Sequence, residues 1–254
     1  MTNRIPLHRG LEFAANCRAR LVSQGILGSV ADRVTDDAFE KIFRAENILV
    51  AHVGMSEKVS AVYMRSDPYA LVLVNQMHTV GHQRFSLAHE LCHHYFHRDL
   101  NTWICAVDLM PHDQREREAN EFAAAFLLPA EGVGELFPGF VNELRDMRRA
   151  VLKLCNYYRT SWQSTVYRLF DLRLISSREK NELVEVSVTS LVREFSVDTD
   201  LFAPGRHVKL PAEFTEVARE LLERGIISQR KFESMMDDLS ALARCGGESA
   251  GVAR

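Results

Sequence analysis

Disulfide and zinc-ribbon patterns are missing from this sequence of 254 residues. It has five cysteines, an odd number, and no two of them form a Cys-x-x-Cys pair, which argues against a disulfide framework and against a zinc ribbon. Glycine and proline are scarce, with 13 and 7 residues, while hydrophobic residues make up 46% of the chain. This composition excludes collagenous, low-complexity and disordered classes and predicts a globular protein with a full hydrophobic core.

Long apolar runs and a positive net charge are also absent. No run of about eighteen apolar residues occurs, and the first ten residues, MTNRIPLHRG, lack the apolar stretch of a secretory signal. We therefore expect a soluble cytoplasmic protein with no membrane partner. The formal net charge of −3 supplies no global field that would hold nucleic acid, so any such contact must be local.

Hydrophobic periodicity predicts an α+β fold. Helices are expected over 11–21, 36–43, 81–97 and 115–128. Three runs rich in Val and Leu, at 48–53, 59–64 and 70–74, indicate a small antiparallel sheet. The strand at 70–74 is a candidate edge on which an extended peptide could lie, although an ordinary sheet edge explains it equally well.

The distribution of charge predicts three parts in the chain. Residues 141–180 carry nine basic and four acidic side chains and form the only basic block. We expect a main domain over 1–138, a helix-turn-helix-like unit over 139–188, and a C-terminal helical unit with a flexible tail over 189–254. In the middle unit, Trp162, Val166 and Leu169 would form one apolar helix face. The last unit is expected to turn at Gly225, with Ser228 as the next helix cap.

The clearest chemistry lies in His89-Glu90-Leu91-Cys92-His93, an HExxH motif. At about 100° per residue, His93 lies about 40° from His89 on one helix face, so both imidazoles can reach one ion with Glu90 beside them. A chance HExxH on a solvated helix is the simpler explanation, but this helix is apolar around most of its circumference. Polar groups beside such a core are costly unless something satisfies them. The motif therefore predicts Zn2+ on His89 and His93, with Glu90 as the catalytic base.

A third protein ligand is expected, because a catalytic zinc site holds three and leaves one position open. The metzincin continuation would need Gly at position 96 and His at 99, where this chain has Phe96 and Asp99. The following helix offers three glutamates. Glu116 falls within its apolar stripe, whereas Glu118 and Glu121 point away from it and suit a surface glutamate paired with an arginine. Glu116 is therefore the expected third ligand.

Two further side chains are candidates around this metal site. Asn120 lies one helical turn beyond Glu116 and can hydrogen-bond a metal ligand. His97 lies one turn beyond His93 and can shape the cleft or stabilise an oxyanion, but a simple polar rim residue is the favoured interpretation, because three ligands already suffice.

The stretch RFSLAHELCHH, followed 23 residues after His93 by E-x-x-A-N-x-F-A and then LLP, resembles the ImmA/IrrE family of bacterial zinc peptidases. The resemblance extends over about 48–129 and implies a zincin-like metallopeptidase domain. It implies Zn2+ ligation by His89, His93 and Glu116 with Glu90 as base. It also implies that the substrate is a cytosolic helix-turn-helix repressor, whose cleavage releases a mobile-element or stress-response regulon.

One position departs from the family pattern. The family usually has glycine where this chain has Cys92. A small filler of the core is the favoured interpretation of Cys92, and a redox-sensitive neighbour of the metal is the alternative.

Two other functions compete with the peptidase. The basic block contains Arg159, Gln163 and Arg168 in a helix-turn-helix-like pattern that could contact DNA, but its excess charge is modest and simple packing is favoured. A zinc-containing protein that docks a partner without turnover is the other alternative.

Overall fold

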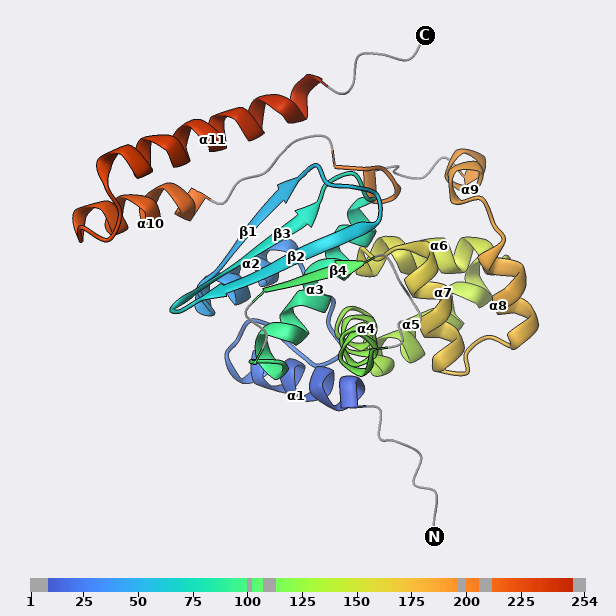
Figure 1. The fold of residues 1–254 in the computed structure, drawn as a ribbon. Helices are drawn as coiled ribbons and strands as arrows, with labels where there is room; N and C mark the ends of the chain where they lie inside the picture. Colours follow the sequence, from blue (N-terminus) through green and yellow to red (C-terminus); the bar gives the residue numbers. More distant parts are fainter. Residues whose placement is uncertain (1–8, 100–101, 107–112, 196–199, 206–211, 249–254) are drawn as a thin grey trace. The chain divides into compact units, whose positions relative to one another are not determined.

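The computed structural model describes residues 9–99, 102–106, 113–195, 200–205 and 212–248 and confirms the expected α+β fold (Figure 1). Within these ranges the chain forms eleven α-helices, one short 3-10 helix and four strands. It divides into two compact units, which we describe separately. The first is drawn from Met1–Ile42, Thr79–Leu100 and Asp108–Ala203, and the second from Phe43–His78, Asn101–Val107 and Pro204–Arg254.

The second unit contains a four-stranded sheet in the order β1-β3-β2-β4. Its strands are β1 (Ile48–Val53), β2 (Val59–Ser66), β3 (Tyr69–Asn75) and β4 (Thr102–Ala106). The expectation of a purely antiparallel sheet is wrong for one pair: β2 is antiparallel to β3 and β4, but β1 runs parallel to β3. Since β3 lies inside the sheet, it is not the edge for an extended peptide; β1 and β4 are the edges.

Asn75, at the end of β3, organises the turn between β1 and β2. It is fully buried, and its Nδ2 donates to the carbonyls of Ser56 at 2.9 Å and Val59 at 2.8 Å. Its Oδ1 accepts from the backbone N–H of Met55 at 3.1 Å. A buried amide with both ends satisfied holds an irregular turn that has few backbone hydrogen bonds of its own.

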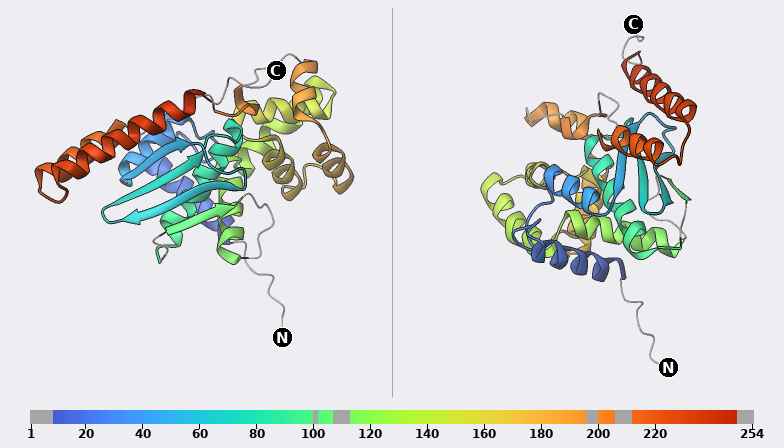
Figure 2. Two further views of the ribbon diagram at one scale, coloured as in Figure 1. Left: turned by 45° about the horizontal axis from the view of Figure 1, so that its top comes forward. Right: turned by 90° about the vertical axis from the view of Figure 1, so that its left-hand side faces the viewer.

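The same unit contains two C-terminal helices, α10 (Ala212–Glu223) and α11 (Gln229–Glu248), which contact each other as an antiparallel pair (Figure 2). The chain reverses at Gly225, which has a positive φ of 69° that glycine adopts without strain. Ser228 then caps α11, because its hydroxyl accepts from the Lys231 N–H at 3.2 Å. The predicted turn and the predicted cap are both confirmed.

The first unit is helical, and α4 lies at its centre. Its elements are α1 (Arg9–Ser23), α2 (Asp36–Ala45, whose last three residues count with the second unit), α3 (Val80–Phe96), α4 (Gln114–Leu127), α5 (Ala130–Leu144), α6 (Met147–Tyr158), α7 (Trp162–Asp171), α8 (Ser177–Val184), α9 (Val188–Phe195) and η1 (Asp200–Phe202). Helix α4 contacts α1, α3 and α7. It begins at Asp113, whose side chain accepts from the N–H groups of Arg115 and Glu116, a strong N-cap.

Helix α3 carries the HExxH motif and begins at Thr79, whose hydroxyl accepts from the His82 N–H at 3.3 Å. Close packing then fixes its first turn. A Cβ on Gly81 would lie 2.7 Å from the backbone nitrogen of Ser161 and 2.8 Å from the carbonyl carbon of Thr160. Only glycine lets α3 approach the turn between α6 and α7 this closely.

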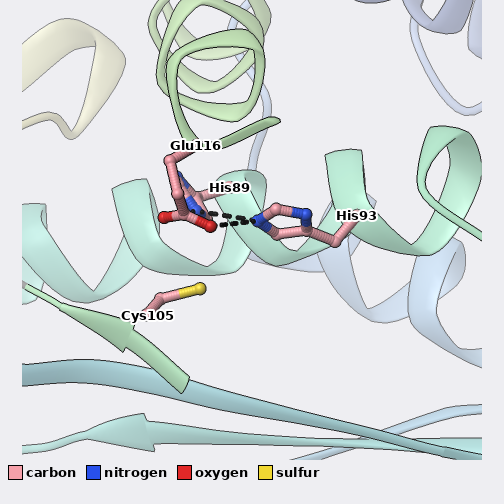
Figure 3. Close-up of side chains that lie close together, drawn as sticks. All are labelled: His89, His93, Cys105 and Glu116. Carbon is pink, nitrogen blue, oxygen red and sulfur yellow. Dashed lines mark hydrogen bonds and ion pairs between the residues drawn. The ribbon is translucent and has the colours of Figure 1, made fainter. Parts of the chain in front are cut away.

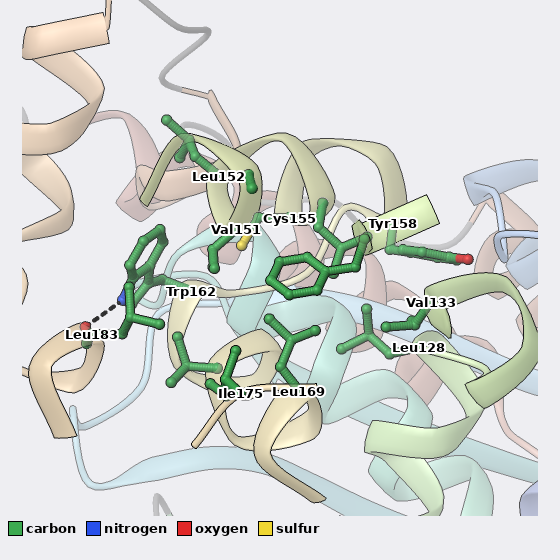
Figure 4. Close-up of a cluster of buried hydrophobic side chains, with 14 of the residues drawn as sticks. Leu128, Val133, Val151, Leu152, Cys155, Tyr158, Trp162, Leu169, Ile175 and Leu183 are labelled. Atoms are coloured by element: carbon green, nitrogen blue, oxygen red, sulfur yellow. Dashed lines mark hydrogen bonds between the residues drawn. The ribbon is translucent and has the colours of Figure 1, made fainter. Parts of the chain in front are cut away.

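Helices α5 to α9 share a hydrophobic cluster with Trp162 in it (Figure 4). Trp162, Val166 and Leu169 are buried in this cluster, as the apolar face of the middle unit predicted. The indole Nε1 of Trp162 donates to the carbonyl of Leu183 in α8 at 2.9 Å. The ring is therefore buried without leaving its N–H group unsatisfied.

The length and apolar composition of the helices bear on whether any of them could cross a membrane. Among the described residues, no single helix is both long and apolar enough to cross a bilayer. Helices α4 and α5 meet that length and composition only when they are taken together across their 57° bend.

Candidate metal centre

The structure brings His89, His93 and Glu116 together, although α3 and α4 are separate segments of the chain (Figure 3). Nε2 of His89 lies 3.3 Å from Oε2 of Glu116, and Nε2 of His93 lies 3.1 Å from Oε1. The two Nε2 atoms lie 3.1 Å apart. Three side chains from two helices therefore converge on one point.

These separations fit a tetrahedral metal ion. With metal–ligand bonds of about 2.0–2.1 Å, neighbouring ligand atoms in a tetrahedron lie about 3.3–3.4 Å apart. Two imidazole nitrogens and one carboxylate oxygen form a donor set typical of catalytic zinc, with a fourth position left for water or substrate. The residues present thus suit a divalent metal ion of the kind that the sequence predicts.

Asn120 orients one of the two imidazoles. Its Oδ1 lies 2.9 Å from Nδ1 of His89. Since an amide oxygen only accepts, Nδ1 of His89 carries a proton and donates it, which leaves Nε2 to face the metal position. The structure therefore places Asn120 where the sequence predicted a residue that hydrogen-bonds a ligand.

The two imidazoles differ in their affinity for protons. Burial disfavours a charge on His89, but its contact with Glu116 and the nearby charge of Glu90 raise its pKa above the ordinary value. Burial dominates at His93 and lowers its pKa to about 4. Burial alone would raise the pKa of Glu116, but hydrogen bonds from both histidines outweigh it and hold that pKa well below the ordinary range. Without a metal, His89 therefore binds an additional proton more readily than His93 does, and Glu116 is negatively charged.

Glu90 and Cys92 lie on the same helix and are both buried. Glu90 is 1% exposed, and it influences the pKa of its neighbour His89 through its charge. A buried carboxylate next in sequence to a proposed ligand suits a proton acceptor. Cys92 is fully buried, and burial raises the pKa of its thiol well above the ordinary value. These properties favour the interpretation of Cys92 as a core filler over a reactive thiolate.

His97 and Glu118 lie elsewhere than the sequence suggested. Glu118 was expected to point outward with an arginine partner. Its Oε1 does lie 3.3 Å from NH1 of Arg9, but the residue is only 6% exposed, and Oε2 lies 3.1 Å from Nε2 of His97. His97 is also 6% exposed and is not a rim residue. The spacing of residues along α4 could not predict this pair, because it describes α4 alone, whereas α1 and α3 together cover Glu118.

The basic candidates for DNA contact do not share one exposed face. Gln163 is exposed and Arg159 is partly exposed. Arg168 is only 6% exposed, and its Nε donates to the carbonyl of Leu128 at 3.0 Å. The guanidinium of Arg168 therefore binds the end of α4 and is turned into the protein, not toward the surface that a nucleic acid would meet.

Comparisons with known proteins agree with this fold. Residues 45–170 match the Peptidase_M78 family, described as the IrrE N-terminal-like domain. The match includes the sheet, α3 and α4, and extends past position 129 through α5 and α6 into α7. Residues 45–170 therefore form a domain of the IrrE N-terminal-like family, and the predicted resemblance is confirmed.

A particular relative can also be named. Metallopeptidase ImmA of Bacillus subtilis (strain 168) is 27% identical to this chain over 143 residues, which cover 55% of this chain and 75% of the relative. Together, the family and this relative support a metallopeptidase of the IrrE/ImmA type.

Proposed function

We propose that this protein is a zinc-dependent endopeptidase that cleaves a cytosolic helix-turn-helix transcriptional repressor and so derepresses its regulon. The observation that carries the proposal is the convergence of His89, His93 and Glu116 within 3.1–3.3 Å, with the buried Glu90 one residue from the first ligand. The repressor as substrate rests on the resemblance to the ImmA/IrrE family.

The chemistry divides between the metal and the residues of the chain. A zinc ion held by His89, His93 and Glu116 supplies Lewis acidity, which lowers the pKa of water and polarises a carbonyl group. Glu90 accepts the proton of the attacking water and returns it to the leaving amine. Asn120 keeps His89 in the tautomer that offers Nε2. With one negative ligand, Glu116, and two neutral imidazoles, the three side chains would neutralise only part of the charge of a divalent ion and leave it able to stabilise negative charge.

The test compares three variants. We expect Glu90→Gln to keep wild-type zinc stoichiometry and to lose about 10²–10⁴-fold in cleavage rate, because only the proton transfer is removed. We expect His89→Ala and Glu116→Ala to lose zinc as well as activity. Metal analysis of the purified proteins gives the stoichiometry. Mixing each protein with a small repressor encoded in a neighbouring reading frame gives the cleavage rate.

Two outcomes would count against the proposal. Full zinc occupancy in Glu116→Ala would move the third ligand to another residue. Unchanged biological activity in Glu90→Gln would favour the alternative of a docking protein with a structural, non-turnover zinc site, since docking does not need the base.

A further inference from the structure

A continuous line of side chains leads away from the proposed metal position behind His93. Nδ1 of His93 lies 2.8 Å from Nδ1 of His97, and Nε2 of His97 lies 3.1 Å from Oε2 of Glu118. The other oxygen of Glu118 accepts from Gln114 Nε2 at 2.9 Å and lies 3.3 Å from Arg9 NH1. The line ends at a carboxylate that is held by two donors.

Burial makes this arrangement significant. His93 is 0% exposed, and His97 and Glu118 are each 6% exposed. Polar groups at such depth are costly when unpaired, so the protons between them must be arranged consistently. Water cannot replace a missing partner here as it would at the surface.

Hydrogen-bonding rules allow one consistent arrangement of protons when His93 binds a metal. Its Nε2 must offer a lone pair to the ion, so the ring proton sits on Nδ1 and is donated to His97. His97 must then accept at Nδ1 and carry its own proton on Nε2. That proton points at Glu118, which as a carboxylate only accepts.

We infer that His97 and Glu118 are positioning residues that form a tautomer relay, in which Glu118 fixes the tautomer of His97 and His97 fixes that of His93. This inference rests on the proposed function, because it concerns a metal ligand of the same site. Ligand histidines usually donate directly to a carboxylate, a carbonyl or water. His93 instead reaches its carboxylate through a second imidazole, while His89 donates directly to Asn120.

The relay gives α4 three roles within five positions. Glu116 supplies a metal ligand, Glu118 ends the line behind His93, and Asn120 accepts from His89. Both proposed ligand histidines on α3 therefore depend on α4 for their orientation as well as for the third donor.

The first experiment measures tautomers in the wild-type full-length protein. Nitrogen-15 NMR of the histidine rings, with zinc added, distinguishes Nδ1–H from Nε2–H. We expect His93 to show a proton on Nδ1 that is protected from exchange, and His97 to show a proton on Nε2 only. A proton on Nδ1 of His97 would overturn the relay without any variant having to fold.

The second experiment measures zinc affinity by competition with a chromophoric chelator. We expect Glu118→Gln to weaken zinc binding about 10–100-fold. Arg9 favours the amide oxygen of the introduced glutamine on its own side. The amide NH2 then faces His97 and reverses the direction of the hydrogen bonds between position 118 and His93.

We expect His97→Leu to weaken zinc binding similarly, and His97→Asn to restore much of it, because the asparagine Oδ1 can accept from His93. Glu135→Gln removes the same charge from an exposed position of α5 and should leave the affinity unchanged.

The outcomes separate the relay from the proposed function. Wild-type protein that binds no zinc would overturn the metallopeptidase proposal itself. If Glu118→Gln and His97→Leu bind zinc as tightly as the wild-type protein does, only the relay is overturned. Equal losses in His97→Leu and His97→Asn would also overturn it, since they would show a need for the imidazole as such and not for an acceptor at that place.

Discussion

His89 and His93 occupy neighbouring turns of one helix, yet their pKa values are shifted in opposite directions. The pKa of His89 is raised, whereas burial lowers that of His93 to about 4. His93 is therefore neutral at neutral pH, and His89 is the imidazole of the two that keeps its additional proton to higher pH, a proton that a metal must displace.

This difference predicts how zinc affinity depends on pH. A group with a raised pKa stays protonated to higher pH, so the affinity should fall as pH falls through the pKa of His89 and should level off above it. Because one proton is displaced, the logarithm of the affinity should change by about one per pH unit in that range. Chelator competition across a pH series measures the slope. A slope near two would show that His93 is protonated as well.

Arg84 is a residue whose loss should destabilise the fold. Its side chain is 4% exposed. It donates to the carbonyls of Val34 and Arg159 and to the carboxylate of Asp36. Arg84→Met would leave two carbonyls without this donor, and we expect the free energy of unfolding to fall by about 2–4 kcal/mol. Arg178→Met is the matched control, because Arg178 is 88% exposed beside Glu182 and its loss should leave the free energy of unfolding nearly unchanged. Urea unfolding of both variants tests this, and equal losses would contradict it.

Single side chains were predictable where their own helix buries them. His89, His93 and Glu116 could be proposed because the spacing of residues on one helix indicates which face they share. Glu118 and Arg168 could not be placed in this way. Their burial comes from neighbouring segments, since Glu118 meets Arg9 of α1 and Arg168 meets the carbonyl of Leu128.

At the scale of elements, the contact of α3 with the turn after α6 sets the position of the motif helix. Gly81→Ala would force a Cβ within 2.7 Å of the Ser161 nitrogen, and we expect a loss of about 1–3 kcal/mol from overpacking. Gly134→Ala is the control on α5, where a Cβ meets nothing within 4 Å. There alanine should stabilise by about 0.5–1 kcal/mol. Thermal unfolding measures both changes, and a gain at both positions would disprove the close approach.

The sequence predicted the helices better than the sheet. Helices α3 and α4 follow from local apolar spacing, and the cap that the structure shows for α4, Asp113, is local as well. The strand β4 has five residues and pairs with β2, which is far away in the chain. The parallel pairing of β1 with β3 likewise depends on contacts beyond either strand. Local patterns carry little information about such pairings.

At the scale of the whole molecule, the compact units do not follow the order of the chain. Each unit is assembled from three separate segments, whereas charge and composition suggest continuous domains over 1–138, 139–188 and 189–254. Composition can mark a change along the chain, but it does not reveal which distant segments pack together. These continuous limits stay a prediction.

Zinc should stabilise the folded chain, because its three proposed ligands converge only after α3 and α4 have packed. At a free zinc concentration of 100 times the dissociation constant, we expect a gain of about 2.7 kcal/mol, or about 5–10 °C in Tm for a chain of this size. Calorimetry with zinc and then with excess chelator measures the gain and its reversal. Glu90→Gln should respond like the wild type and Glu116→Ala should not. An identical gain in Glu116→Ala would place zinc elsewhere.

The concentration of Glu116, Glu118 and Asn120 on α4 has a consequence for any regulation of the centre. A shift of α4 along its axis would move Glu116 away from the metal position. The same shift would remove Glu118 and Asn120, which fix the orientation of the two ligand histidines. The site would then empty as a unit, without passing through a weakened form that still holds its ion. An effector that binds α4 could thus inactivate the protein in a single step.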